Sequence, residues 1–341
     1  MKLLFNKIVL VPGTDTEPAK GNGPLELKQL TGSYYANNDW QRIEMDVILE
    51  SEKLLKLIGK PVYNIAANFY HDGATPELNP PVDYEEFLNH VRYPIALSAV
   101  YKYYQGNIVS HEDTGRKLKL DKDRESIPWE WMFDKDDQAH QQKAVAAVDR
   151  LINYLDGLEL EAWQNSDAQK ATRDLFVNNT AVFQRYFPID DSPLFYHTVV
   201  PFITSIQLTI IAPVLGPEKF NSLLNWYKST PVAGTSDDQE NLTMITYIQK
   251  AIVLLTMVDA VTLLSLKVLP TGVVQEFSSM MQSKNANQPV LKEYLELYCR
   301  KLQKAADLSL DKLKVYVLDP SETLDFEFIP KNSPDRKFFR T

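Results

Sequence analysis

The sequence predicts an all-α fold: a tandem duplication of a three-helix unit, with a projecting β-hairpin and extended termini. Apolar residues recur at helical spacing over most of the 341 residues. The second half repeats features of the first half in the same order. We expect an extended N-terminal arm (1–38), a first helical repeat (39–160) that carries the hairpin (107–120), a second helical repeat (161–318) and a C-terminal tail (319–341).

The composition is that of a folded protein with an acidic surface. Hydrophobic residues make up 44% of the chain and charged residues 24%, and the formal net charge is -9. An acidic chain lacks the excess of Lys and Arg that general binding to nucleic acid requires. The single cysteine, Cys299, excludes an intramolecular disulfide and favours a reducing compartment.

The first repeat begins after a strand-like start (1–12) and a stretch rich in Gly and Pro. Between residues 39 and 58 apolar residues follow helical spacing, Asn38 or Asp39 can cap the start, and Gly59 ends the helix. A second helix is expected at about 84–104, with a kink or break at Pro94. Ile108-Val109 and Leu118-Leu120 flank the turn signal Asp113-Thr114-Gly115, which predicts the hairpin, and a helix at about 136–156 closes the unit.

Three matches in the same order predict the duplication. Residues 57–70 align without gaps on residues 214–227, with Gly59 on Gly216 and with matching aromatic positions. We also align residues 105–109 with 270–274, and the closing helix of the first unit with a helix at about 288–314. Two long apolar stretches, 199–215 and 251–269, contain polar residues and are therefore expected to be buried bundle helices.

The sequence lacks the familiar catalytic motifs. No HExxH pair, no G-x-S-x-G and no phosphate-binding glycine loop occurs. The cluster His111-Glu112-Asp113 lies at the predicted hairpin tip, where a solvated turn is expected. Three aspartate pairs (136–137, 190–191 and 237–238) precede predicted helices, so we interpret them as helix caps. Mid-helix Asp259 is expected to pair with a base or to face a subunit interface.

The chain resembles head-to-tail connector (neck ring, or adaptor) proteins of tailed phages, in particular a family from Bacteroides-type phages and prophages. The resemblance rests on residues 175–189, on Val200-Pro201-Phe202-Ile203 and the helix into residues 211–216, and on the helix, hairpin, helix order of the first half. It covers most of residues 39–318, but neither the N-terminal arm nor the C-terminal tail has a match.

The resemblance implies a structural protein of the virion neck, present in the host cytoplasm during assembly, with no catalytic, cofactor or metal residues. It would form a homo-oligomeric ring, commonly twelvefold, that contacts the portal protein and tail or other neck proteins. DNA would pass through the channel without specific binding, and no membrane is involved. The expected contacts come from the hairpin and the basic aromatic tail: Ile108, Val109, Leu118, Leu120, Arg336, Lys337, Phe338, Phe339 and Arg340.

Two other functions are compatible with the sequence. A helical enzyme would need carboxylates from different helices to converge on an apolar pocket. A host-encoded scaffold or interaction protein would bind other helices and would be recognised by its partners.

Overall fold

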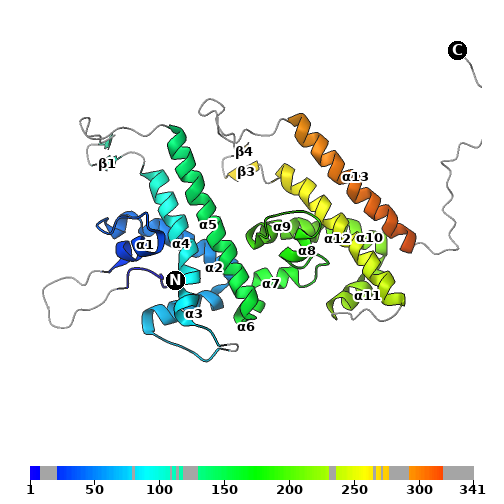
Figure 1. Cartoon of the computed structure of the whole chain (residues 1–341), viewed down its shortest axis with the longest axis horizontal. Coiled ribbons are helices and arrows are strands. Elements are labelled where there is room, and N and C mark those ends of the chain that lie inside the picture. Colours follow the sequence, from blue (N-terminus) through cyan, green and yellow to red (C-terminus); the bar gives the residue numbers. More distant parts are fainter. Residues whose placement is uncertain are drawn as a thin grey trace, which may run out of the picture.

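The computed structural model describes residues 1–7, 21–78, 81–107, 110–112, 115–117, 130–229, 236–263, 266–269, 272–275 and 292–317. These residues are mostly helical, as predicted for the all-α class. Figure 1 shows an elongated molecule, with α1 toward one end of the long axis and α13 toward the other.

The first half contains a short N-terminal helix and four longer ones. In order these are α1 (Gly23–Thr31), a 3-10 turn η1 (Trp40–Arg42), α2 (Glu44–Ile58), α3 (Lys60–Asp72), α4 (Tyr84–Gly106) and α5 (Glu130–Leu158). Asp83 caps α4 by accepting hydrogen bonds from the backbone N–H groups of Glu85 and Glu86. At Pro94, where we expected a kink or a break, α4 continues as one helix. The long helices α4 and α5 pack against each other.

Short helices lead into the second half. They are α6 (Glu161–Gln164), α7 (Asp167–Thr172) and α8 (Thr180–Gln184). A continuous helical segment follows, made of α9 (Pro193–Ile206), the π-helical turn η2 (Gln207–Ile211) and α10 (Ala212–Leu215). After α11 (Pro217–Lys228), the long helices α12 (Ser236–Leu263) and α13 (Lys292–Val317) pack against each other.

Two short antiparallel strand pairs connect the long helices. β1 (Ser110–Glu112) pairs with β2 (Gly115–Lys117) between α4 and α5, inside the range predicted for the hairpin. β3 (Leu266–Leu269) pairs with β4 (Gly272–Gln275) between α12 and α13. Both pairs lie in the upper part of the view in Figure 1.

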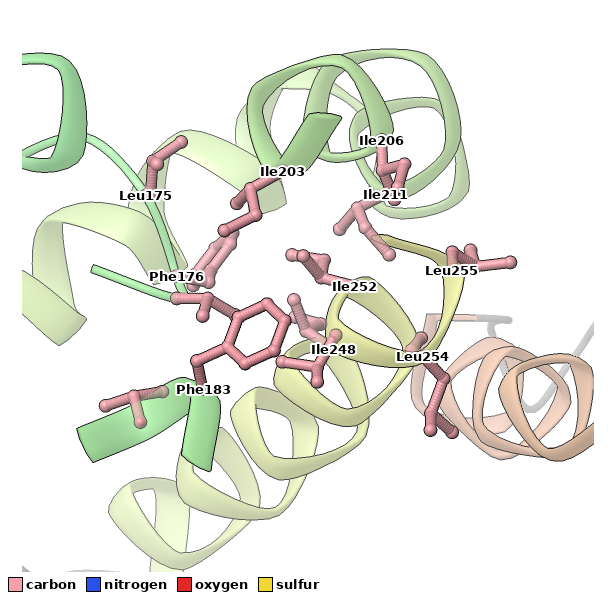
Figure 2. Close-up of a cluster of buried hydrophobic side chains, with 14 of the residues drawn as sticks. Leu175, Phe176, Phe183, Ile203, Ile206, Ile211, Ile248, Ile252, Leu254 and Leu255 are labelled. Atoms are coloured by element: carbon pink, nitrogen blue, oxygen red, sulfur yellow. The ribbon is translucent and has the colours of Figure 1, made fainter. Parts of the chain in front are cut away.

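The buried side chains form two separate hydrophobic clusters. One contains residues from Leu4 to Trp163, and the other contains residues from Leu175 to Leu313. In the second cluster, Ile248 and Ile252 of α12 face Phe176 and Ile203, as Figure 2 shows. Burial of an apolar stripe on each helix is what holds these helices in place, because an isolated helix of this length is marginal in water.

Two helical segments are long and apolar enough, by length and composition, to cross a membrane: Pro193–Leu215 and Asp237–Leu263. Within their most apolar windows, 39% and 67% of the residues are buried inside the protein. Much of the apolar surface of α12 is therefore covered by the second cluster.

The prediction of an extended N-terminal arm is wrong for the described residues. Leu4 and Phe5 are buried in the first cluster, at 0% and 2% exposure, and residues 1–7 form no strand. Residues 23–31 form α1, where Pro24 stands at the start and Leu27 faces the core. Proline fits the first turn of a helix, which is why this Gly- and Pro-rich stretch conceals a helix start.

Two further sequence interpretations need correction. The alignment of residues 105–109 with 270–274 sets Asn107, the residue that ends α4, against Gly272, the first residue of β4, so it joins unlike elements. Asp136 and Asp137 lie inside α5, and Asp190 and Asp191 adopt left-handed backbone conformations before Ser192, which is the residue that caps α9. Aspartate tolerates this conformation better than most residues do.

Candidate functional site

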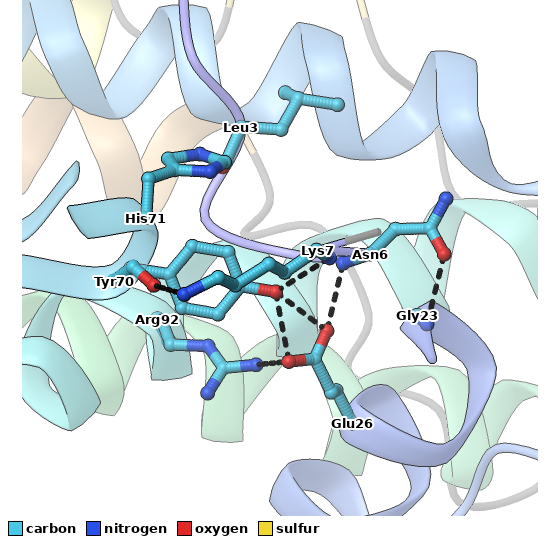
Figure 3. Close-up of polar contacts among 8 residues, drawn as sticks. All are labelled: Leu3, Asn6, Lys7, Gly23, Glu26, Tyr70, His71 and Arg92. Carbon is cyan, nitrogen blue, oxygen red and sulfur yellow. Dashed lines mark hydrogen bonds and ion pairs between the residues drawn. The ribbon is translucent and has the colours of Figure 1, made fainter. Parts of the chain in front are cut away.

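A half-buried polar network ties the N-terminus to the first half. Glu26 of α1 accepts hydrogen bonds from the Tyr70 hydroxyl (2.8 Å) and from the backbone N–H of Asn6 (2.7 Å), and forms an ion pair with Arg92 at 3.1 Å. The Lys7 backbone N–H donates to the Tyr70 hydroxyl at 2.9 Å. Figure 3 shows how residues 1–7, α1, α3 and α4 meet at this carboxylate.

The chemistry of this network is structural. The Arg92 guanidinium lies over the rings of Phe5 and Tyr70, 4.8 Å and 5.2 Å from their centroids. Burial, followed by the nearby Glu26 charge, raises the pKa of Tyr70, so the hydroxyl stays protonated and keeps donating to Glu26. Because each of these groups is engaged by another member of the network, we assign it to anchoring residues 1–7.

A second polar contact joins the two halves of the chain. The Asp149 carboxylate of α5 accepts hydrogen bonds from the Ser192 hydroxyl (2.9 Å) and from the backbone N–H of Leu194 (2.8 Å) at the start of α9. Leu194 packs against the first hydrophobic cluster, and the rings of Trp163 and His197 lie 6.2 Å apart. A carboxylate on the N–H groups of a helix start is stabilising, so Asp149 fixes α9 against α5. We call this contact the internal junction.

The histidines occupy structural positions. His71 Nε2 lies 2.7 Å from the Leu3 carbonyl oxygen, and His140 Nε2 lies 3.6 Å from Asp136. His90 stacks on Tyr154 at 4.0 Å. Burial lowers the pKa of His90, with Arg150 contributing in the same direction, and burial also lowers the pKa of His197.

No group of three or more His, Cys, Asp or Glu side chains in the described part of the chain could hold a metal ion. Asp237 and Asp238 lie in the first turn of α12, where Asp238 accepts a hydrogen bond from Trp226 Nε1 at 3.0 Å. Asp259 is half-buried in α12. His111 and Glu112 lie in β1, and Asp113 is outside the described residues.

The contact residues expected from the sequence all lie outside the described residues. These are Ile108, Val109, Leu118 and Leu120 next to the first strand pair, and Arg336, Lys337, Phe338, Phe339 and Arg340 in the tail.

The described surface offers apolar patches that sequence reasoning missed. A groove of about 510 Å³ at the adjoining ends of α12 and α13 is lined by Val261, Tyr294, Leu295, Leu297, Tyr298 and Lys301. Tyr294 is 64% exposed and Leu297 is 47% exposed. The sequence of α13 could have indicated this groove. The helix carries these apolar residues in addition to its buried residues Ala306 and Leu313, so its apolar surface is wider than one buried stripe.

Two more pairs of exposed apolar residues lie on α13 and on α2. Leu308 and Val315 of α13 are 56% and 66% exposed, and Met45 and Leu49 of α2 are 63% and 46% exposed. Pairs at these spacings share one side of a helix. Exposed apolar side chains grouped in this way are typical of contact surfaces.

Two regions of the chain, residues 54–173 and 211–328, match the Family of unknown function (DUF6712). The chain belongs to this family. No curated protein and no solved structure matches the chain. Membership of DUF6712 carries no assigned activity, so function has to be argued from the arrangement of the residues.

Proposed function

We propose that this protein is a structural connector of a tailed phage, built from two copies of one helical unit and assembled as a homo-oligomeric ring between the portal and the tail. The structural observation that supports the repeated unit is one antiparallel strand pair in each half, both in the upper part of the molecule in Figure 1. Four further observations favour the duplication, and the shape of the repeated unit favours the ring.

A constant offset of 157 residues relates the two halves from α2 to the second strand of each pair. Gly59 and Gly216 end one helix and begin the next, with nearly equal backbone angles (φ 85, ψ 150 and φ 73, ψ 158). The offset also places Gly115 on Gly272. The pairing of Glu112 with Gly115 then corresponds to that of Leu269 with Gly272, so the registers agree.

The burial pattern of α4 and α12 follows the same offset. The buried residues of each of these two helices face the hydrophobic cluster of their own half. Nine of the ten buried residues of α4 have buried counterparts in α12, and the exception is His90, whose counterpart Tyr247 is half-buried. The nine are Phe87, Leu88, Val91, Pro94, Ile95, Ala96, Ala99, Val100 and Tyr103, with counterparts Met244, Ile245, Ile248, Ala251, Ile252, Val253, Thr256, Met257 and Ala260. Such agreement without a gap supports a common origin of the two helices.

The closing helices correspond at an offset of 162. Val148-Asp149-Arg150-Leu151 aligns with Leu310-Asp311-Lys312-Leu313. The stacked pair His90 and Tyr154 then corresponds to Tyr247 and Tyr316, whose ring centroids lie 6.3 Å apart. A contact between the same two helices at the same two positions supports the alignment independently of residue identity.

The family matches point the same way. The two matched regions begin at residues 54 and 211, which are also 157 residues apart, and their lengths are nearly equal. Two matches of this kind are expected when one domain occurs twice.

A duplicated unit with a projecting strand pair suits lateral assembly. A closed ring needs two different complementary surfaces on each subunit, which a repeated unit supplies at its two ends. The strand pairs and the exposed apolar patches on α2 and α13 supply contacts to neighbouring subunits, the portal and tail or other neck proteins. The connector role itself rests on the resemblance in helix order and aromatic pattern.

Mass photometry and negative-stain microscopy of the purified full chain, alone and mixed with a portal protein, test this function. We expect a discrete ring or a discrete complex with the portal. A protein that stays monomeric across the accessible concentrations, with and without portal, contradicts the proposal. Convergence of carboxylates around an enclosed apolar pocket in an experimental structure would favour a helical enzyme instead.

A further inference from the structure

We infer that α1, α3 and α4 form a peptide-binding slot in the first half, and that residues 1–7 of this chain fill the slot reversibly. The ligand class is a non-helical peptide with adjacent leucine and phenylalanine, as in Leu4-Phe5. The slot belongs to a single chain, so the inference goes beyond the proposed ring, although its comparison of the two halves rests on the proposed duplication.

The slot contacts the main chain of residues 1–7 at four points. Two carbonyl oxygens lie 3.1 Å and 2.7 Å from slot side chains, and two backbone N–H groups donate hydrogen bonds of 2.7 Å and 2.9 Å. Contacts with the main chain give affinity for a peptide without selecting its side chains. In chain order, the four pairs are Lys2 with Tyr63, Leu3 with His71, Asn6 with Glu26, and Lys7 with Tyr70.

Two side chains of the segment provide the selectivity. Leu4 and Phe5 are 0% and 2% exposed and belong to the first hydrophobic cluster. The Arg92 guanidinium lies 4.8 Å from the centroid of the Phe5 ring, which favours an aromatic side chain at this position. The slot therefore selects a peptide by its two apolar anchors and holds it by its main chain.

The corresponding positions of the second half contact a second Leu-Phe segment. Leu175 and Phe176 are 3% and 0% exposed in the second hydrophobic cluster. At the offset of 157, the slot residues Tyr63, Tyr70, His71 and Arg92 correspond to Phe220, Tyr227, Lys228 and Gln249. The rings of Phe220 and Tyr227 lie 5.7 Å and 6.1 Å from the Phe176 ring, Lys228 pairs with Asp174, and Gln249 donates to the Phe176 carbonyl oxygen at 2.8 Å.

The two segments differ in how the chain holds them. Residues 173–179 lie directly between α7 and α8, so this segment can leave its slot only if a helix moves. In the first half, residues 8–20 separate the segment from the start of α1 in the sequence. A groove of about 590 Å³ also leaves part of the outer side of residues 2–7 open. The first segment can therefore leave its slot while α1, α3 and α4 stay in place.

A labelled peptide with the sequence of residues 1–7 tests the slot by fluorescence anisotropy. In the full-length variant Leu4→Asp with Phe5→Asp, two charges replace the apolar anchors, so its own segment no longer fills the slot. We expect this variant to bind the peptide saturably. The wild type should bind it at least about tenfold more weakly, because its tethered segment competes at an effective concentration of about 1 mM. A peptide with the same two substitutions is the matched control and should bind neither protein.

Hydrogen exchange of the wild type gives a second measurement that does not depend on the folding of the variant. The amides of Asn6 and Lys7 should exchange at least about a hundredfold faster than the amide of Phe176, whose N–H donates to the buried Gln207 side chain at 2.9 Å. Amides of α3 and α4 should stay protected meanwhile. Asn6 and Lys7 amides as slow as that of Phe176, or a folded variant that binds no peptide, would overturn the inference. Both measurements concern single chains, so a wild type that never assembles contradicts only the proposed function.

Discussion

Gly59 and Gly216 hold the chain at helix junctions in a conformation that other residues reach only with strain. With φ 73 and ψ 158, Gly216 lies in a region almost reserved for glycine, and a Cβ atom there would meet no heavy atom within 4 Å. Gly216→Ala should therefore lower the free energy of unfolding by about 1–3 kcal/mol through backbone strain alone. Urea unfolding measures this change.

The matched control is Gly157→Ala inside α5. A Cβ atom at this position also meets nothing within 4 Å, but the backbone is helical. Alanine should therefore be neutral or raise stability by up to about 1 kcal/mol, since alanine favours helix. Equal changes in the free energy of unfolding for Gly216→Ala and Gly157→Ala would show that the backbone angles at Gly216 do not cause its loss of stability.

His197 couples stability to pH. Burial lowers its pKa in the folded state below the usual value of about 6.5, so the unfolded state takes up a proton first as the pH falls. Its contribution to stability is complete above pH about 6.5 and decreases as the pH drops below that value. His197→Phe keeps a ring beside Trp163 and removes the titration, so the loss of unfolding free energy between pH 7.5 and 5 should be smaller than in the wild type. An unchanged slope would exclude His197 as a source of the pH dependence.

Among the elements, α4 and α12 each supply buried residues to one of the two hydrophobic clusters. Ile95 and Ile252, which the proposed duplication aligns, are 1% and 0% exposed. Ile95→Ala and Ile252→Ala should each cost about 2–5 kcal/mol, because each leaves a cavity in a packed core. Leu208→Ala, at a position 57% exposed, should cost well under 1 kcal/mol.

Hydrogen exchange can localise these effects. Since the two hydrophobic clusters are separate, Ile95→Ala should speed exchange mainly in α2 to α5, and Ile252→Ala mainly in α9 to α13. Equal acceleration across the whole chain after either change would mean that the halves unfold as one unit.

The long helices were predictable because each buries an apolar stripe with helical spacing. The helix expected at about 84–104 is α4, and that expected at about 288–314 is α13. The sequence did not predict α1, because a nine-residue helix with Gly and Pro at its start shows little periodicity. The role of Glu26 in anchoring the N-terminus appears only in its contacts with the distant residues Tyr70 and Arg92. The alignment of residues 105–109 with 270–274 rested on short apolar pairs, whereas the offset of 157 in the proposed duplication sets Gly115 on Gly272.

The internal junction was not visible in the sequence. Asp149 lies 43 positions before Ser192 in the chain, and only the packing of α9 against α5 brings the two together. The sequence also did not show which apolar residues are exposed. Leu308 and Leu313 are both leucines of α13, and only the fold distinguishes the exposed Leu308 from the buried Leu313.

At the scale of the whole molecule, the proposed duplication predicts the symmetry of the assembled ring. If each chain contributes two similar units, a ring of a given number of chains contains twice that number of units and strand pairs. Native mass spectrometry should count the chains, and class averages from electron microscopy should show twice as many peripheral lobes. Alternate lobes should differ slightly, since the halves have diverged in sequence. A lobe count equal to the chain count would mean that the two halves occupy different places in the assembly, and would contradict a ring in which both halves act as the same unit.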